Sequence, residues 1–92
     1  MITVVNSIKR TCTAFPAQWH GLTYDDRQIY VRYRHGWLSI RLGGVGDADE
    51  FAAVNGEEIF AKQINPPHGG EMEYEELKAH TTGQIEWPEK EE

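Results

Sequence analysis

Residues 28–42 read QIYVRYRHGWLSIRL, in which apolar and polar side chains alternate on both sides of His35-Gly36. Alternation with a period of two is typical of a β-strand with one buried face. A two-residue break that ends in glycine, between two such runs, predicts a tight hairpin turn. The stretch therefore predicts a β-hairpin over residues 28–42 in which Arg34 lies opposite Trp37.

This hairpin sorts its side chains onto two faces. The apolar face, which we expect to cover the core, carries Ile29, Val31, Tyr33, Leu38, Ile40 and Leu42. We expect the preceding strand to turn at Asp25-Asp26 and to pair Leu22 with Ile29, which puts its tryptophan beside Arg32. The other face, called the outer face below, then gathers three aromatic side chains and three arginines: Trp19, Tyr30, Arg32, Arg34, Trp37 and Arg41.

Arginines mixed with aromatic rings suit a surface that binds nucleic acid or a ribonucleoprotein. Guanidinium groups bind phosphates through paired hydrogen bonds, and aromatic rings stack on unpaired bases. The same residue types dominate the energetics of protein interfaces, so a protein partner is also compatible with this face. Two plainer alternatives stay open: the side chains decorate an exposed sheet, or helices of the same domain pack over them.

Outward from the hairpin, the sequence predicts one α+β domain over residues 1–87, a small antiparallel sheet with two short α-helices. Further strands are expected at 2–8, 11–15 and 84–87. The first helix should cover 48–54 with Asp47 as its N-cap, and the second, acidic one should cover 72–80. Residues 58–64 suit a strand or a helix, and we favour the strand. Residues 88–92 are expected to form a charged, frayed tail.

Charge is distributed unevenly along the 92 residues, whose net charge is −6. Residues 1–46 hold six basic and two acidic side chains, whereas residues 47–92 hold three basic and thirteen acidic ones. Such asymmetry suggests an interaction protein with two unlike faces. We expect Asp47, Asp49 and Glu50 to meet a lysine-rich protein surface, because complementary charge favours fast and selective association. Ordinary solvated surface is the alternative interpretation.

Other classes of function find little support in the sequence. No Ser-His-Asp or Cys-His arrangement stands out, and the four histidines lack the spacing of a metal site, so we expect neither an enzyme, nor a metal, nor a cofactor. The single cysteine, Cys12, fits a reducing compartment and an inert thiol. Residues 43–47 (GGVGD) lack the Lys-Ser/Thr pair of a phosphate loop. No apolar run is long enough for a membrane span, and the start does not read as a secretory signal.

The segment from Trp19 to Gly43 reads WHGLTYDDRQIYVRYRHGWLSIRLG. It resembles a pattern in small phage and bacterial proteins, roughly W-x-G-x-T followed by Y-x-R-Y-R-x-G-x-L-S-x-R. With the small size and acidic character of the chain, it is similar to phage anti-CRISPR proteins that inhibit the type I-F RNA-guided surveillance complex. The resemblance implies a stoichiometric inhibitor in the cytoplasm of the bacterial host. Such an inhibitor docks on protein subunits, with guide RNA as a further candidate contact, and it blocks binding of target DNA.

Three hypotheses of different classes follow. The first is the phage inhibitor of a type I CRISPR complex, which uses the outer face. The second is a small module that binds single-stranded nucleic acid, which the negative net charge disfavours. The third is a small-molecule enzyme, which is disfavoured because no convergent set of titratable groups is evident.

Overall fold

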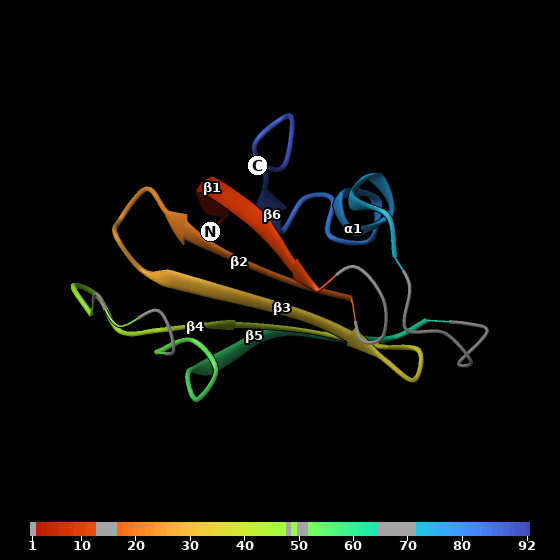
Figure 1. Cartoon of the computed structure of the whole chain (residues 1–92), viewed down its shortest axis with the longest axis horizontal. Helices are drawn as coiled ribbons and strands as arrows, with labels where there is room; N and C mark the ends of the chain where they lie inside the picture. The colour runs from red at the N-terminus through yellow and green to blue at the C-terminus, as the bar shows by residue number, and fades with distance from the viewer. Residues whose placement is uncertain (1, 13–16, 48, 50–51, 65–71) are drawn as a thin grey trace.

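Six β-strands form one sheet in the computed structural model, which describes residues 2–12, 17–47, 49, 52–64 and 72–92 (Figure 1). The elements are β1 (Thr3–Cys12), β2 (Ala17–Thr23), β3 (Gln28–Arg34), β4 (Trp37–Leu42), β5 (Glu57–Gln63), α1 (Tyr74–His80) and β6 (Ile85–Glu86). Their order across the sheet is β5-β4-β3-β2-β1-β6. Neighbouring strands are antiparallel, except that β6 runs parallel to β1. The sheet curls into a half-barrel.

The hairpin of β3 and β4 has the predicted register. Arg34 pairs with Trp37, and the pairing continues without a shift to Ile29 and Leu42. Both turn residues have positive φ angles, 53° at His35 and 74° at Gly36, as the tight turn that matches the twist of the strands requires. All six residues expected on the core face are buried: Ile29, Val31, Tyr33, Leu38, Ile40 and Leu42.

The turn between β2 and β3 is one residue longer than expected, so the predicted pairing of Leu22 with Ile29 is wrong. Thr23 and Arg27 close the loop, with the Thr23 amide 2.9 Å from the Arg27 carbonyl, and Asp26 adopts a φ of 61°. Leu22 therefore pairs with Gln28. A shift of one residue moves every side chain of a strand to the opposite face. The side chains of β2 therefore lie on the opposite faces of the sheet from those predicted.

The core fills the concave side of the half-barrel, and α1 packs against it. Tyr74 and Leu77 of the helix are buried in the same cluster as the inner side chains of β1 to β4. The helix begins at Tyr74, slightly later than expected. Glu73 forms a capping box with Glu76, whose carboxylate accepts the Glu73 amide at 3.1 Å, and this reciprocal bonding satisfies free donors of the first turn.

The second helix expected over 48–54 is wrong. Residues 52–55 form turns, and residues 48, 50 and 51 lie outside the described part of the chain. Asp47 does accept a backbone N–H, from Asp49 at 3.1 Å, but this bond closes a local turn. The Ala52 amide bonds to the Asp49 carbonyl, three residues back, instead of the carbonyl four residues back that an α-helix needs. Aspartate competes with helix formation in this way.

The predicted α+β class is wrong, because the described residues form a mostly β structure with a single short helix. Residues 58–64 largely form a strand, β5, as favoured. Two expected strands, at 2–8 and 11–15, overlap one long bulged strand, β1, and residues 13–16 lie outside the described part. In the described ranges, no helix has the length and apolar character to span a membrane.

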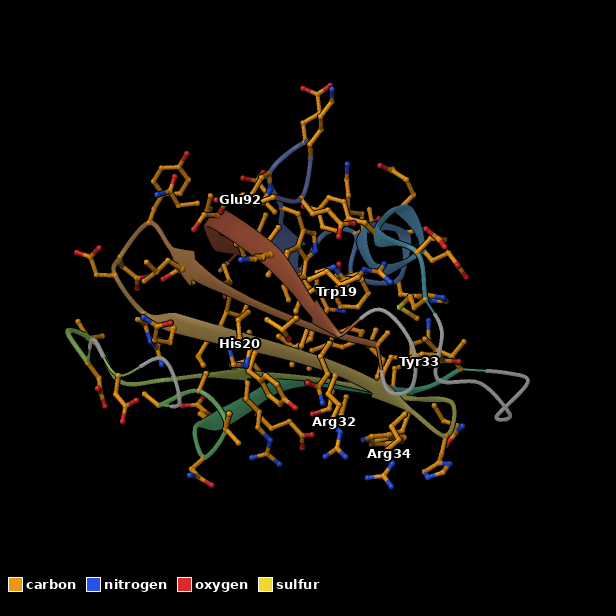
Figure 2. All side chains as sticks on the ribbon, viewed as in Figure 1. Trp19, His20, Arg32, Tyr33, Arg34 and Glu92 are labelled. Carbon is orange, nitrogen blue, oxygen red and sulfur yellow. The ribbon has the colours of Figure 1, made fainter. Side chains whose placement is uncertain are left out.

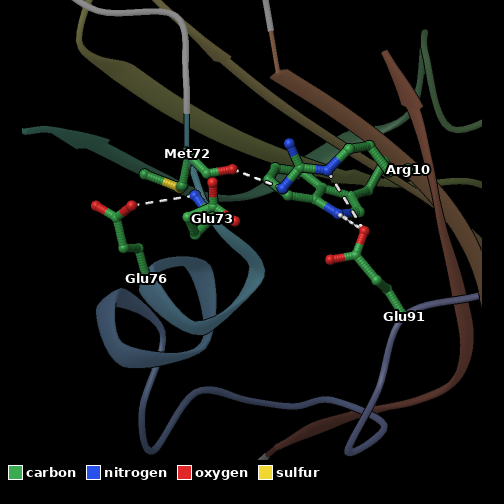
Figure 3. A network of polar contacts seen from close by, with 6 residues as sticks. Arg10, Met72, Glu73, Glu76 and Glu91 are labelled. Atoms are coloured by element: carbon green, nitrogen blue, oxygen red, sulfur yellow. Dashed lines mark hydrogen bonds and ion pairs between the residues drawn. The ribbon is translucent and has the colours of Figure 1, made fainter. Parts of the chain in front are cut away.

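The C-terminal segment 88–92, expected to be frayed, lies against β1 and α1. The Tyr74 hydroxyl donates to the Pro88 carbonyl at 2.6 Å, and the Glu92 amide donates to the Ile8 carbonyl at 2.8 Å. Glu91 accepts from Arg10 Nε and from Trp19 Nε1, each at 3.4 Å. Arg10 also donates to the Met72 carbonyl at 2.7 Å, so it links β1, the residues before α1 and the C-terminal segment (Figure 3).

Candidate nucleic-acid interface

The outer face of the β3–β4 hairpin presents two adjacent rows of side chains. One row, on β3, carries Tyr30, Arg32 and Arg34. The other row, on β4, carries Arg41, Ser39 and Trp37 opposite them in that order. Arg32 and Arg34 point away from the interior of the half-barrel and from α1 (Figure 2). The described helix therefore covers the opposite face of the sheet and not this one.

These six side chains line an open cavity of about 700 Å³. Its rim is completed by the hairpin turn, by residues that precede β5 and by one carboxylate of β5. The additional lining residues are His35, Val54, Asn55 and Glu58. All five residues of the predicted outer face that lie on β3 and β4 line this cavity. The prediction that the hairpin gathers these five side chains on one face is confirmed.

None of the three arginines of this cavity forms an ion pair with a described carboxylate, although Glu58 lies opposite Arg41 across β4 and β5. Within the described residues, the ion pairs join Arg10 to Glu91 and Lys78 to Glu75, both elsewhere. Arg41 donates to the Gly56 carbonyl at 3.1 Å, and Arg34 donates to the His35 ring at 3.2 Å. Glu58 is the acidic member of the lining, and it accepts the Ser39 hydroxyl at 3.1 Å.

Arg32, at the centre of its row, holds an unsatisfied donor. Its Nε is buried and has no hydrogen-bond partner in the described structure. Leaving a buried donor of a charged group without an acceptor costs about 1–3 kcal/mol or more. Buried polar groups are almost always satisfied in folded proteins, so this atom is an exception among the described residues.

Two aromatic rings stand beside the arginines. Trp37 is 45% exposed, a large fraction for a tryptophan. Tyr30 is partly buried, and the His20 ring of β2 contacts it edge-on with centroids 4.9 Å apart. The cation–π contacts found in the described part of the chain, Arg10 over Trp19 and Lys78 over Tyr74, lie outside the cavity.

Trp19 does not belong to the outer face, and its assignment there is wrong. It pairs with Val31, and it is fully buried inside the half-barrel (Figure 2). The longer turn before β3 causes the difference, because it turns β2 over. The outer side of β2 instead carries Gln18, His20 and Leu22, which lie opposite Arg32, Tyr30 and Gln28.

The expected acidic contact residues lie apart from this cavity. Asp47 and Asp49 are exposed and share a local turn through the Asp47 carboxylate. Glu50 lies outside the described residues. Neither described aspartate lines the cavity, so the two sets of predicted residues form separate surfaces.

The cavity also contains a serine, a histidine and a glutamate. Ser39 donates to the Glu58 carboxylate at 3.1 Å, and the His35 ring accepts from Arg34 at 3.2 Å. These contacts therefore join the serine to the glutamate and the histidine to an arginine. Among the residues with assigned positions, no group of three or more histidine, cysteine or acidic side chains is arranged to hold a metal ion.

Sequence reasoning missed His20, Val54, Asn55 and Glu58 as neighbours of the site. The first depends on the register of β2, and the others depend on how β5 pairs with β4, where a bulge lies between Ile40 and Arg41. Neither the loop length nor the bulge is visible in the alternation of apolar side chains.

Neither a family model, nor a curated protein, nor a solved structure matches this chain.

Proposed function

We propose that this protein acts by binding, and that the outer face of the β3–β4 hairpin docks on a ribonucleoprotein. The observation that carries the proposal is the open cavity with three arginines that lack ion-pair partners among the described residues. Phosphates are the partners that clustered arginines bind best, through charge-assisted hydrogen bonds. The exposed Trp37 ring offers a surface on which a base stacks.

A ribonucleoprotein fits this chain better than free nucleic acid does, because the net charge is −6. Free polyanions are repelled by the rest of the molecule. The acidic side chains include exposed ones at the N-cap of α1, on α1 and on the chain after it: Glu73, Glu75, Glu76, Glu86, Glu89 and Glu92. A partner that combines RNA with lysine-rich protein complements both kinds of surface.

The resemblance of residues 19–43 to type I-F anti-CRISPR proteins narrows the proposal to one kind of ribonucleoprotein. We propose that the partner is a type I CRISPR surveillance complex, and that the protein blocks capture of target DNA stoichiometrically in the bacterial cytoplasm. RNA-guided complexes read DNA by base pairing that begins at a short seed. A protein bound beside the guide obstructs that step without any chemistry.

A binding assay with the guide-loaded complex tests this proposal. The protein should co-purify with the loaded complex and reduce its capture of target DNA as the molar ratio approaches equivalence. Arg32→Glu combined with Trp37→Ala should weaken both effects. Lys62→Glu makes the same change of charge at an exposed residue of β5 that does not line the cavity, and it should leave both unchanged.

Normal capture of target DNA at saturating inhibitor contradicts the inhibitory mechanism. Binding that tolerates the double substitution contradicts the assignment of the outer face. The second hypothesis, a module for free single-stranded nucleic acid, predicts that RNA or DNA oligonucleotides bind at physiological salt more tightly than the loaded complex does. The proposed function predicts the reverse order of affinities, because the net negative charge repels a free polyanion.

A further inference from the structure

We propose that the cavity on the outer face binds RNA directly, with Arg32 holding a backbone phosphate and Trp37 holding an adjacent base. This inference rests on the proposed function in supposing that the partner contains RNA. It goes further because it names the ligand of the cavity and the two side chains that recognise it. A ribonucleoprotein could otherwise be contacted through its protein subunits alone.

The first step of the argument is the guanidinium group of Arg32, which lies in the cavity wall. Its Nε is buried, so a phosphate that enters the cavity meets the two terminal nitrogens instead. These nitrogens lie side by side and match two oxygens of one phosphate. Arg32 takes part in neither ion pair of the described residues, so the contact with phosphate replaces no salt bridge.

The second step is the spacing of the positive charges. Arg32 and Arg34 are two residues apart on one strand, about 6.6 Å along it. Successive phosphates of an extended single strand are separated by a similar distance. Arg41 lies on the neighbouring strand, opposite Tyr30. Two arginines therefore follow β3 and a third lies beside them on β4. This arrangement suits successive phosphates of a nucleic-acid backbone better than it suits one isolated ion.

The third step separates RNA from an acidic peptide, which also offers oxyanions. Trp37 is exposed at the end of β4, opposite Arg34. A base stacks on an indole ring next to a phosphate bound by arginine, as in proteins that bind single strands. An acidic peptide leaves the exposed ring without a partner, so we commit to RNA.

Oligouridylate of eight nucleotides provides the test, with binding measured by fluorescence anisotropy over a series of salt concentrations starting near 50 mM. Arg32→Gln should raise Kd at least about tenfold, since a charge-assisted hydrogen bond is lost. It should also reduce the slope of log K against log salt by about 0.7, as expected for one phosphate contact to a single strand. Trp37→Ala should raise Kd while leaving the slope unchanged.

Lys90→Gln is the matched control, because it removes one positive charge from an exposed residue outside the cavity; it should change neither the affinity nor the slope appreciably. Arg32→Gln should leave the domain at least as resistant to thermal unfolding as the unmodified protein, because it removes a buried donor that has no acceptor in the described structure. An unchanged affinity for oligouridylate in Arg32→Gln overturns the inference, as does polyglutamate that competes as well as RNA does.

The failure of this inference is distinguishable from the failure of the proposed function. If the protein binds the guide-loaded complex through the outer face but oligouridylate does not bind, the cavity contacts a protein subunit and the RNA inference is wrong. If oligouridylate binds as described and the loaded complex does not, the inference holds and the proposed partner is wrong.

Discussion

Trp19 and Val31 lie opposite each other across β2 and β3, and both side chains are fully buried. Arg10, which pairs with Trp19 across β1 and β2, lies over the indole ring, with its Cζ 4.5 Å from the ring centroid. The indole N–H is directed to the Glu91 carboxylate. The tryptophan therefore joins the centre of the sheet to the last residues of the chain.

Replacement of Trp19 by alanine should destabilise the protein by about 3–5 kcal/mol, because it leaves a large cavity in the core. Urea denaturation monitored by circular dichroism measures this change. Trp37→Ala is the matched control, since that ring lies on the outer face and is 45% exposed; its effect should stay below about 1 kcal/mol. Equal losses for the two substitutions contradict the face assignment of β2.

A charge introduced on either face of β3 distinguishes its two sides. Val31→Asp buries an unpaired carboxylate and should unfold the domain, as should Ile40→Asp on β4. Arg32→Glu changes a side chain of the outer face and should leave the domain folded. Far-ultraviolet circular dichroism and gel filtration of the three variants check this. If Arg32→Glu is as destabilising as Val31→Asp, the outer face is not an open surface.

The C-terminal segment should contribute measurably to stability. Glu91→Gln weakens the contacts with Arg10 and Trp19, so we expect a loss of about 0.5–1 kcal/mol in the free energy of unfolding. Glu89→Gln, at an exposed residue of the same segment, makes the same change of charge and is the control. Equal stability of the two variants in urea denaturation shows that the carboxylate of Glu91 does not hold the segment.

Alkaline pH should destabilise the fold through Tyr74. Burial first, and then the carboxylates of Glu91 and Glu75, raise the pKa of Tyr74 from 10.0 to about 12. The folded state then holds the phenol proton more tightly than the unfolded state does. This stabilisation is complete below pH 10 and is lost as the pH rises towards 12.

The measurement is urea denaturation at intervals between pH 9 and 12. Tyr74→Phe should flatten the decline in stability over this range, although it also removes the hydrogen bond to the Pro88 carbonyl. Tyr24→Phe, at a tyrosine that is 69% exposed, should leave the decline unchanged. If stability declines equally with pH in Tyr74→Phe and in the unmodified protein, deprotonation of Tyr74 is not the cause of the alkaline destabilisation.

The part of the fold that the sequence predicts well is local. The β3–β4 hairpin follows from alternation and from His35-Gly36, because a two-residue turn fixes the register of both strands. The register of β2 depends on whether Asp26 adopts a positive φ, and aspartate tolerates both conformations. The positive φ of Asp26 is therefore the reason why the sequence predicts the wrong face for Trp19.

The remaining differences arise from contacts between distant parts of the chain. Aspartate favours helix N-caps, so Asp47 is a suitable cap by residue type. Residues 52–55 nevertheless form turns. The last five residues look like a frayed tail, and they lie against β1 through Glu91 and Glu92. The unsatisfied Nε of Arg32 depends on how neighbouring side chains pack around it, and no sequence pattern reports that.

Hydroxyl-radical footprinting of side chains, with and without the guide-loaded complex, tests the role of the outer face most directly. Trp37 and Tyr24 are both exposed, so we expect both to react in the free protein; of the two, Trp37 lines the cavity and Tyr24 does not. We predict that binding protects Trp37 from oxidation and leaves Tyr24 as reactive as before. Protection of Tyr24 with an unchanged rate at Trp37 contradicts the account.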